Sequence, residues 1–170
     1  PNRDQARELS RETEAVKAEL QAALTTEGRR TMLEKADAAI RQAREAVQQA
    51  MSETRGFRDE KPAAMTPEQR QGLADRMKRT AGQAEPALAR AEAAGQFLGQ
   101  AANELTDPLD KKVTPALANA ALKAMNQQNA DAPLSDALDG MKDIAAKLDG
   151  YTEAVAAARQ APASATPGAG

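Results

Sequence analysis

The strongest constraint on the fold is a seven-residue apolar repeat between residues 33 and 50. Its two lines consist of Leu33, Ile40 and Val47 and of Ala36, Ala43 and Ala50. The alternation of three-residue and four-residue spacings keeps one stripe of a helix in contact with a neighbouring helix. The segment is therefore predicted to be a helix that packs lengthwise against another helix, as in a coiled coil.

Alanine supplies most of the apolar residues of the chain. Hydrophobic residues make up 41% of the 170 residues, and about 40 of them are alanine, against two Phe, one Tyr and no Trp. Alanine has the highest helix propensity, whereas the β-branched and aromatic residues that favour strands are scarce. Alanine also buries little area, so seams between helices are thin. We expect an all-α fold, an elongated antiparallel bundle of roughly four to five helices with alanine-rich heptad seams.

The N-terminal half is predicted to hold two helices joined by a turn. The first helix is expected from about residue 4 to residue 24. Its apolar face consists of Leu9, Val16, Leu20 and Ala23. A short turn over residues 25–28 ends in Gly28, because glycine favours helix ends. The helix with the seven-residue repeat follows, and a loop is expected over residues 53–65.

A third helix has a clear start signal. Thr66 is a good N-cap, Pro67 suits the first helical position, and Gln69 completes a capping box. The apolar stripe keeps one phase on both sides of Pro86 and extends to Leu105. We therefore expect a single helix that kinks at Pro86.

Gly95 and Gly99 lie in this third helix with the G-x-x-x-G spacing that permits two helices to approach closely. Dimerisation inside a membrane is one interpretation, but the helix is too polar to span a bilayer. Close packing within the chain is favoured, with Phe97 and Leu98 in the core.

Two proline-containing pairs, at Pro108 and Pro115, are expected to interrupt the chain before a short fourth helix that ends at Met125. Its inward side chains are predicted to be Leu117, Ala121, Leu122 and Met125. A polar loop over residues 126–132 follows, and Pro133 opens the last helix. The two apolar lines of that helix are Leu134, Met141, Leu148 and Val155, and Ala137, Ile144, Tyr151 and Ala158.

Residues 1–159 are predicted to form one helical bundle domain. The remaining residues, 160–170, contain only Gln, Ala, Pro, Ser, Thr and Gly. Such a composition buries little apolar surface, so this tail is expected to be a flexible linker. Because the chain starts at Pro1 rather than Met, we expect it to be one domain of a larger protein.

Residue types that carry catalysis are largely missing. The chain has no His and no Cys, which removes the commonest general base, the commonest metal ligand and the thiol nucleophile. Paired-carboxylate chemistry stays open, but alanine seams leave little room for a pocket. Asp136, Asp139 and Asp143 share a helix face, either as a patch for a divalent cation or basic partner or, as we favour, as a solvated face. We expect no enzyme activity, no cofactor and no metal.

The charge pattern argues against two classes of partner. The formal net charge is −2 and charges of both signs are interspersed, so the basic stripe typical of nucleic-acid binding is missing. No stretch approaches the roughly 18 uncharged apolar residues of a membrane span. The localisation is left open by these features.

One cluster has the composition of a contact site. Arg55, Phe57, Arg58 and Lys61 lie close together in the expected loop, and Arg70 near the start of the third helix would share that end of the bundle. A protruding Phe57 ringed by cations could insert at an anionic lipid surface. Alternatively, Phe57 folds back as a plug over the end of the bundle, which is the interpretation we favour.

The leading functional hypothesis is a non-enzymatic module that binds another protein or a second copy of itself. The alternative is a membrane-surface targeting bundle that binds anionic lipid through the Phe57 loop. The Ala-, Gln- and Arg-rich composition without His or Cys resembles that of helical domains in secreted bacterial virulence proteins, such as type III effectors and translocators, and of small bundles that localise bacterial toxins to membranes. This resemblance implies an exported bacterial parent protein and assigns no site residue.

Overall fold

The computed structural model describes residues 2–161, and it describes the side chains of residues 3–17 and 26–161. The elements in this range are α1 (Asn2–Phe57), η1 (Pro62–Ala64), α2 (Pro67–Phe97), α3 (Thr106–Pro108), η2 (Leu109–Val113), α4 (Thr114–Met125) and α5 (Asp131–Gln160). All of them are helical and no strand occurs within residues 2–161, which confirms the prediction of an all-α chain.

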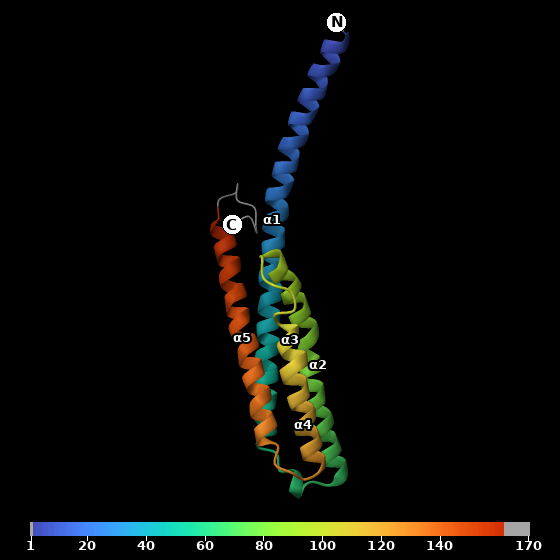
Figure 1. Cartoon of the computed structure of the whole chain (residues 1–170), viewed down its shortest axis with the longest axis vertical. Coiled ribbons are helices and arrows are strands. Elements are labelled where there is room, and N and C mark those ends of the chain that lie inside the picture. Colours follow the sequence, from blue (N-terminus) through green and yellow to red (C-terminus); the bar gives the residue numbers. More distant parts are fainter. Residues whose placement is uncertain (1, 162–170) are drawn as a thin grey trace.

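The long helices lie along one another and each has more than one neighbour. Helix α1 packs against α2 and α5, α2 also packs against α4, and α4 packs against α5. In Figure 1 the chain descends along α1, returns along α2, descends through α3 and α4, and returns along α5. The N-terminal part of α1 continues beyond the ends of the other helices.

The predicted break near Gly28 is wrong, because α1 is one helix of 56 residues from Asn2 to Phe57. A Cβ atom added at Gly28 would meet nothing within 4 Å, and Gly28 is not among the residues with positive φ. Glycine inside a helix costs only about 1 kcal/mol relative to alanine, which good helix formers on both sides offset. The expected loop is shortened accordingly, since α1 ends at Phe57 and η1 follows.

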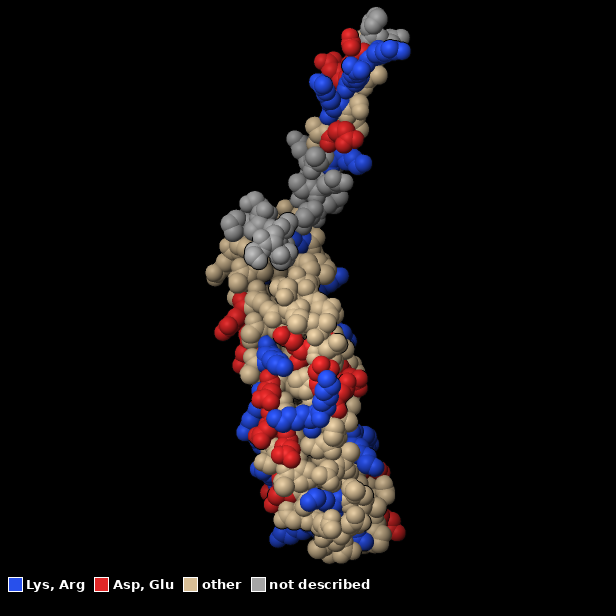
Figure 2. Space-filling model, in the orientation of Figure 1, with Lys and Arg blue, Asp and Glu red and all other residues tan. Residues whose placement is uncertain are grey.

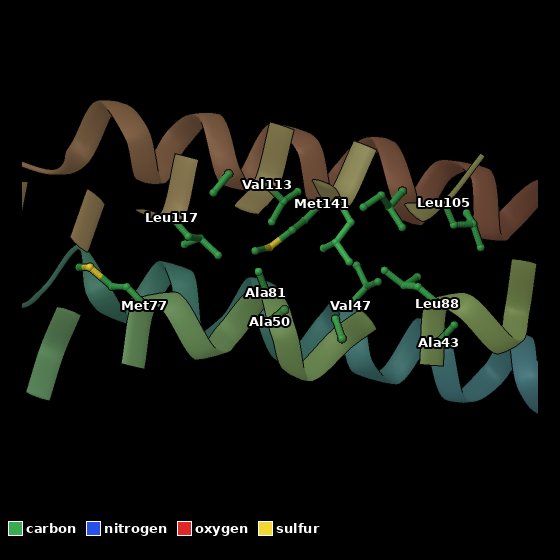
Figure 3. Close-up of a cluster of buried hydrophobic side chains, with 14 of the residues drawn as sticks. Ala43, Val47, Ala50, Met77, Ala81, Leu88, Leu105, Val113, Leu117 and Met141 are labelled. Carbon is green, nitrogen blue, oxygen red and sulfur yellow. The ribbon is translucent and has the colours of Figure 1, made fainter. Parts of the chain in front are cut away.

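The seven-residue repeat of α1 faces the core. Its members are at most 6% exposed, and they are Leu33, Ala36, Ile40, Ala43, Val47 and Ala50. Figure 3 shows side chains of α1 and α2 meeting those of η2, α4 and α5 in one layer between the helices. The larger side chains of this layer include Leu88, Leu105 and Met141, which fill the space that alanines leave open.

Helix α2 starts as predicted. The Gln69 backbone N–H donates to Thr66 Oγ1 at 3.2 Å and the Thr66 N–H donates to Gln69 Oε1 at 2.9 Å, which completes the capping box. Pro86 lies inside this single helix, so the helix does not divide there.

The predicted extension of this helix to Leu105 is wrong. The helix ends at Phe97, because Gly99 adopts a φ of 87° and the Gln100 N–H returns to the Gly95 carbonyl oxygen at 2.8 Å. Leu105 is nevertheless fully buried, as the residue that precedes α3. Phe97 and Leu98 are half-buried at the helix end.

The predicted interruption at Pro115 is also wrong. Residues from Thr106 to Met125 form one helical run through α3, η2 and α4. Pro115 lacks the N–H that would donate to the Lys111 carbonyl, and the chain widens to a π-helical turn in η2 just before it. Proline is usually tolerated only near the start of a helix. Here the π-helical turn of η2 accommodates Pro115 inside the helical run.

The buried face of α4 differs from the prediction. Leu122 is 61% exposed and Met125 is 37% exposed, whereas Ala120 and Ala124 are fully buried beside Leu117 and Ala121. Helix α4 lies between α2 and α5, so small side chains face these close neighbours and Leu122, about 100° further around the helix than Ala121, faces away. The prediction placed the largest apolar side chains of α4 in the core and did not take into account that α2 and α5 both pack against this helix.

Helix α5 begins at Asp131, two residues before Pro133, and the Asp131 N–H donates to Asn129 Oδ1 at 2.7 Å. Seven of the eight predicted core residues of this helix are buried: Leu134, Ala137, Met141, Ile144, Leu148, Tyr151 and Val155. The eighth, Ala158, is half-buried near the end of the helix.

Candidate interaction surfaces

The most exposed apolar side chains of α1 lie on a segment that we call the N-terminal arm, residues 3–17. Every residue of the arm is exposed, and Leu9 and Val16 are 64% and 55% exposed. Figure 2 shows this arm beyond the body of the molecule, with charges of both signs around it. The apolar face predicted for this segment is therefore exposed at Leu9 and Val16. Leu20 and Ala23, predicted for the same face, lie outside the residues whose side chains are described.

Helix α1 contacts the C-terminal end of α5 through Arg29 and Asp37. Arg29 Nη2 donates to the carbonyl oxygen of Ala158 at 2.8 Å, and Arg159 Nη2 lies 3.6 Å from Asp37 Oδ2. Within residues 26–57 of α1, Leu33 is the first buried apolar residue. These contacts tie the C-terminal end of α5 to α1, and the arm extends on the far side of them.

The apolar side chains of the arm are out of phase with those of the bundle. Extending the line of Ala36 toward the N-terminus by whole repeats of seven leads to Ala15 and Glu8. The exposed apolar side chains are Val16 and Leu9, each one residue later. At about 100° of rotation per residue, the 20 residues between Val16 and Ala36 place them about 160° apart around the helix, so the arm presents its apolar stripe in a different direction from the bundle seam.

The predicted contact cluster lies at the opposite end of the molecule. Phe57 is the last residue of α1 and is only 7% exposed, so it packs against the core and does not protrude. The plug interpretation of Phe57 is the one that the structure has. Arg55, Arg58 and Lys61 are exposed, while Arg70 is half-buried and its Nη1 donates to the Met65 carbonyl at 2.6 Å.

Three of those predicted residues line one hollow. Phe57, Arg58 and Lys61 form one wall of an open hollow of about 310 Å³, and the α4–α5 loop from Gln127 to Asp131 forms the other. Arg55 and Arg70 do not contribute to its lining. No sequence pattern predicts that the α4–α5 loop lies beside Phe57. That proximity depends on the lengths of the helices between them, and those lengths were predicted incorrectly from the sequence.

A second hollow, of about 320 Å³, lies along the α1–α2 seam and is lined by Glu53, Phe57, Arg76, Arg79 and Gln83. Two of its charged residues, Glu53 and Arg76, have polar partners nearby. Thr80 Oγ1 donates to Glu53 Oε2 at 3.1 Å, and Arg76 Nη2 lies 3.7 Å from Glu60 Oε1. The hollow is open to solvent, and it resembles a groove between two helices more than an enclosed pocket.

Two buried polar groups have structural partners. Glu92, 8% exposed, accepts hydrogen bonds from the Leu105 N–H at 3.2 Å, the Thr106 N–H at 2.9 Å and Thr106 Oγ1 at 2.8 Å. Tyr151 donates its hydroxyl to Glu104 Oε2 at 3.1 Å. Burial, together with the hydrogen bond to Glu104, raises the pKa of the Tyr151 phenol above its ordinary value.

The remaining predicted features are surface or packing features. Asp136, Asp139 and Asp143 are exposed, and Asp143 Oδ2 lies 3.3 Å from Lys112 Nζ. Among the residues that the structure describes, no group of three or more acidic side chains is arranged to hold a metal ion. None of the described helices has the length and apolar character needed to cross a membrane.

Gly95, but not Gly99, lies at a close helix contact. A Cβ atom built on Gly95 would lie 2.4 Å from Cε2 of Tyr151, so the aromatic ring occupies the space that the missing side chain leaves. Gly99 meets nothing within 4 Å and serves to end α2 through its positive φ. The predicted packing role therefore applies to Gly95 alone.

Comparisons with known proteins add no assignment: no family model, no curated protein and no solved structure matches this chain. A functional proposal must therefore rest on the surfaces described above.

Proposed function

We propose that the chain is a non-enzymatic protein-interaction module, in which an elongated antiparallel bundle with alanine-rich heptad seams holds the N-terminal arm for a partner protein. The observation that carries this proposal is the exposure of Leu9 and Val16, at 64% and 55%, on a helix that continues beyond its neighbours. The bundle supports the arm because one uninterrupted helix belongs to both.

The energetic reason for a partner is the apolar area of the arm. Burying a Leu or Val side chain that is otherwise exposed is worth about 1.5–3 kcal/mol. A helix without tertiary contacts is only marginally stable in water, so a second helix along the arm would also stabilise the arm itself. Both terms favour a helical partner over a flat surface.

The alternative of an anionic membrane surface has weaker support. Its aromatic anchor would be Phe57, which is buried, so only the exposed cations Arg55, Arg58 and Lys61 remain for lipid headgroups. Asp59 lies among them and reduces the local charge. Sedimentation with phosphatidylserine vesicles at low salt, with neutral vesicles as the control, tests this alternative.

A photo-crosslinking amino acid at the position of Leu9 tests the proposed function in cells that produce the protein. We expect a covalent adduct of defined mass from this position. The matched control places the same group at Leu122, which is 61% exposed on the bundle. Adducts of equal yield at both positions, or none at Leu9, would refute the arm as the binding element.

A further inference from the structure

We propose that the partner of the N-terminal arm is the arm of a second copy of this chain, paired in a parallel two-stranded coiled coil. This inference rests on the proposed function and specifies its partner. Three observations carry it: the spacing of the apolar residues in the arm, the charges on either side of them, and the place where the stripe ends.

The arm has its own seven-residue repeat. Ala6 and Thr13 take the first core position of the repeat and Leu9 and Val16 take the fourth, with spacings of three and four between them. All four side chains are exposed in the single chain. Val16 lies 20 residues before Ala36, which at about 100° per residue places the two about 160° apart around the helix, so the stripe of the arm does not continue the internal seam of the bundle. It is a separate seam that nothing in residues 26–161 covers.

The two flanks of this stripe carry opposite charges. Arg3 and Lys17 lie on one flank, and Glu12 with the neutral Gln5 lies on the other. In a parallel pair, each helix places its acidic flank against the basic flank of its neighbour, and Glu12 faces Lys17 of the second copy. In an antiparallel pair, flanks of like sign meet. The charge pattern is thus self-complementary only in the parallel arrangement.

The remaining charges of the arm are compatible with this pairing. Asp4, Arg7, Glu8, Arg11 and Glu14 fall on positions that point away from the stripe. On the C-terminal side, the next two stripe positions in the sequence are Leu20 and Ala23. The two positions after them are occupied by Glu27 and Arg30, which are 71% and 69% exposed and form an ion pair with each other at 4.0 Å. Charged residues at core positions end a coiled-coil seam. The pairing therefore stops before the bundle begins.

Sedimentation equilibrium of the full chain over a concentration series is the direct test. We expect a monomer–dimer equilibrium that is abolished in the Leu9→Asp/Val16→Asp variant. Both side chains are exposed in the monomer, so the helical content and unfolding midpoint of the bundle should stay unchanged. Leu122→Asp is the matched control and should dimerise like the wild type. A wild-type chain that remains monomeric throughout would overturn the inference.

Charge exchange tests the parallel arrangement. Glu12→Lys or Lys17→Glu alone places like charges opposite each other in both symmetric pairs and should weaken dimerisation about tenfold. The double exchange, Glu12→Lys/Lys17→Glu, should restore it. Because the chain has no cysteine, Ala6→Cys supplies a unique thiol near one end of the arm, and it should form a disulfide-linked dimer on oxidation. Arg11→Cys, on the outward face, should not.

These outcomes separate the inference from the proposed function. Loss of dimerisation without rescue by the double exchange, or no disulfide from Ala6→Cys, would overturn the parallel pairing. A photo-crosslinked adduct at Leu9 whose mass is not that of two copies would overturn self-association and leave the arm as a binding element for another protein. No adduct at Leu9 and no dimer would refute both.

Discussion

Replacing Glu92 by alanine tests how the helical run from Thr106 to Met125 is attached to α2. The carboxylate of Glu92 comes from a different helix, yet it accepts three hydrogen bonds at the start of this run, from the backbone of Leu105 and from the backbone and side chain of Thr106. The residue before the run, Leu105, is apolar and makes no capping hydrogen bond of its own. Glu92 therefore satisfies helix-terminal N–H groups that would otherwise lack a partner in the core.

The size of the effect follows from which groups lose their partner. Leu105 is fully buried, and an unsatisfied buried donor costs about 1–3 kcal/mol. Thr106 is half-buried, so water can replace part of what it loses. The hydrogen bonds are also charge-assisted, which makes each of them stronger. We therefore expect Glu92→Ala to lower the free energy of unfolding by about 2–4 kcal/mol. Glu92→Gln keeps an acceptor without the charge and should lose about half as much.

Urea unfolding followed by circular dichroism at 222 nm measures these differences. The matched control is Glu85→Ala on the same helix, whose side chain is exposed and which should change the free energy of unfolding by less than about 0.5 kcal/mol. The thermal midpoint of Glu92→Ala should fall by about 4–15 °C. A Glu92→Ala variant as stable as Glu85→Ala would refute the capping role of Glu92.

Three further predictions concern the bundle. Gly95→Ala would place a Cβ 2.4 Å from Tyr151 Cε2 and should lower the free energy of unfolding by about 1–3 kcal/mol. Gly82→Ala, with open space around it, should raise the free energy of unfolding by up to about 1 kcal/mol. Urea unfolding of the two variants measures both changes. Phe57→Ala should destabilise the fold by about 2–4 kcal/mol in the same assay and leave vesicle sedimentation unchanged, because Phe57 is buried. Because burial raises the pKa of Tyr151, the folded state holds the phenolic proton more tightly than the unfolded state does, so stability should fall as pH rises above about 10. Tyr151 is the sole tyrosine, so phenolate absorbance at 295 nm should appear together with unfolding, and a phenolate that forms in the folded protein at pH 10 would contradict this.

The heptads of α1 show why periodicity predicted so much of the core. Apolar residues at these spacings can bury their area only against another helix, so Leu33, Ile40 and Val47 were identified before any partner was known. The capping box at Thr66 is equally local, since every atom of it lies within four residues. Features of this kind depend on the chain near them and on little else.

The errors have a different origin. Gly28 and Pro115 have the residue types of helix ends, but a helix continues through each, because good helix formers beside Gly28 and a π turn before Pro115 offset the local penalty. Leu122 has the residue type of a core position, yet it is exposed, because the distance to α2 and α5 favours alanine on the inner face. Residue type sets the local free-energy penalty of a conformation, and the free energy of the whole fold decides whether that conformation is adopted.

Part of the candidate interaction surface, the apolar stripe of the N-terminal arm, could be predicted from the sequence. The stripe of Leu9 and Val16 was recognised as apolar and helical, because both properties follow from residue type and spacing. Whether that stripe faces a neighbour within the chain depends on where α2 and α5 end. Helix α2 ends before the turn at Gly99, and α5 ends at Gln160, two residues after the Ala158 carbonyl that accepts from Arg29.

The sequence by itself determined that the described part of the chain has an all-α fold, where its capping box lies and which stripe of each helix is apolar, because helix propensity and periodicity act over a few residues. Only the tertiary structure decided that Phe57 is buried, that Glu92 caps a distant helix and that the arm has no neighbour within the described chain. These depend on the relative lengths and separations of helices far apart in sequence, which no local pattern encodes.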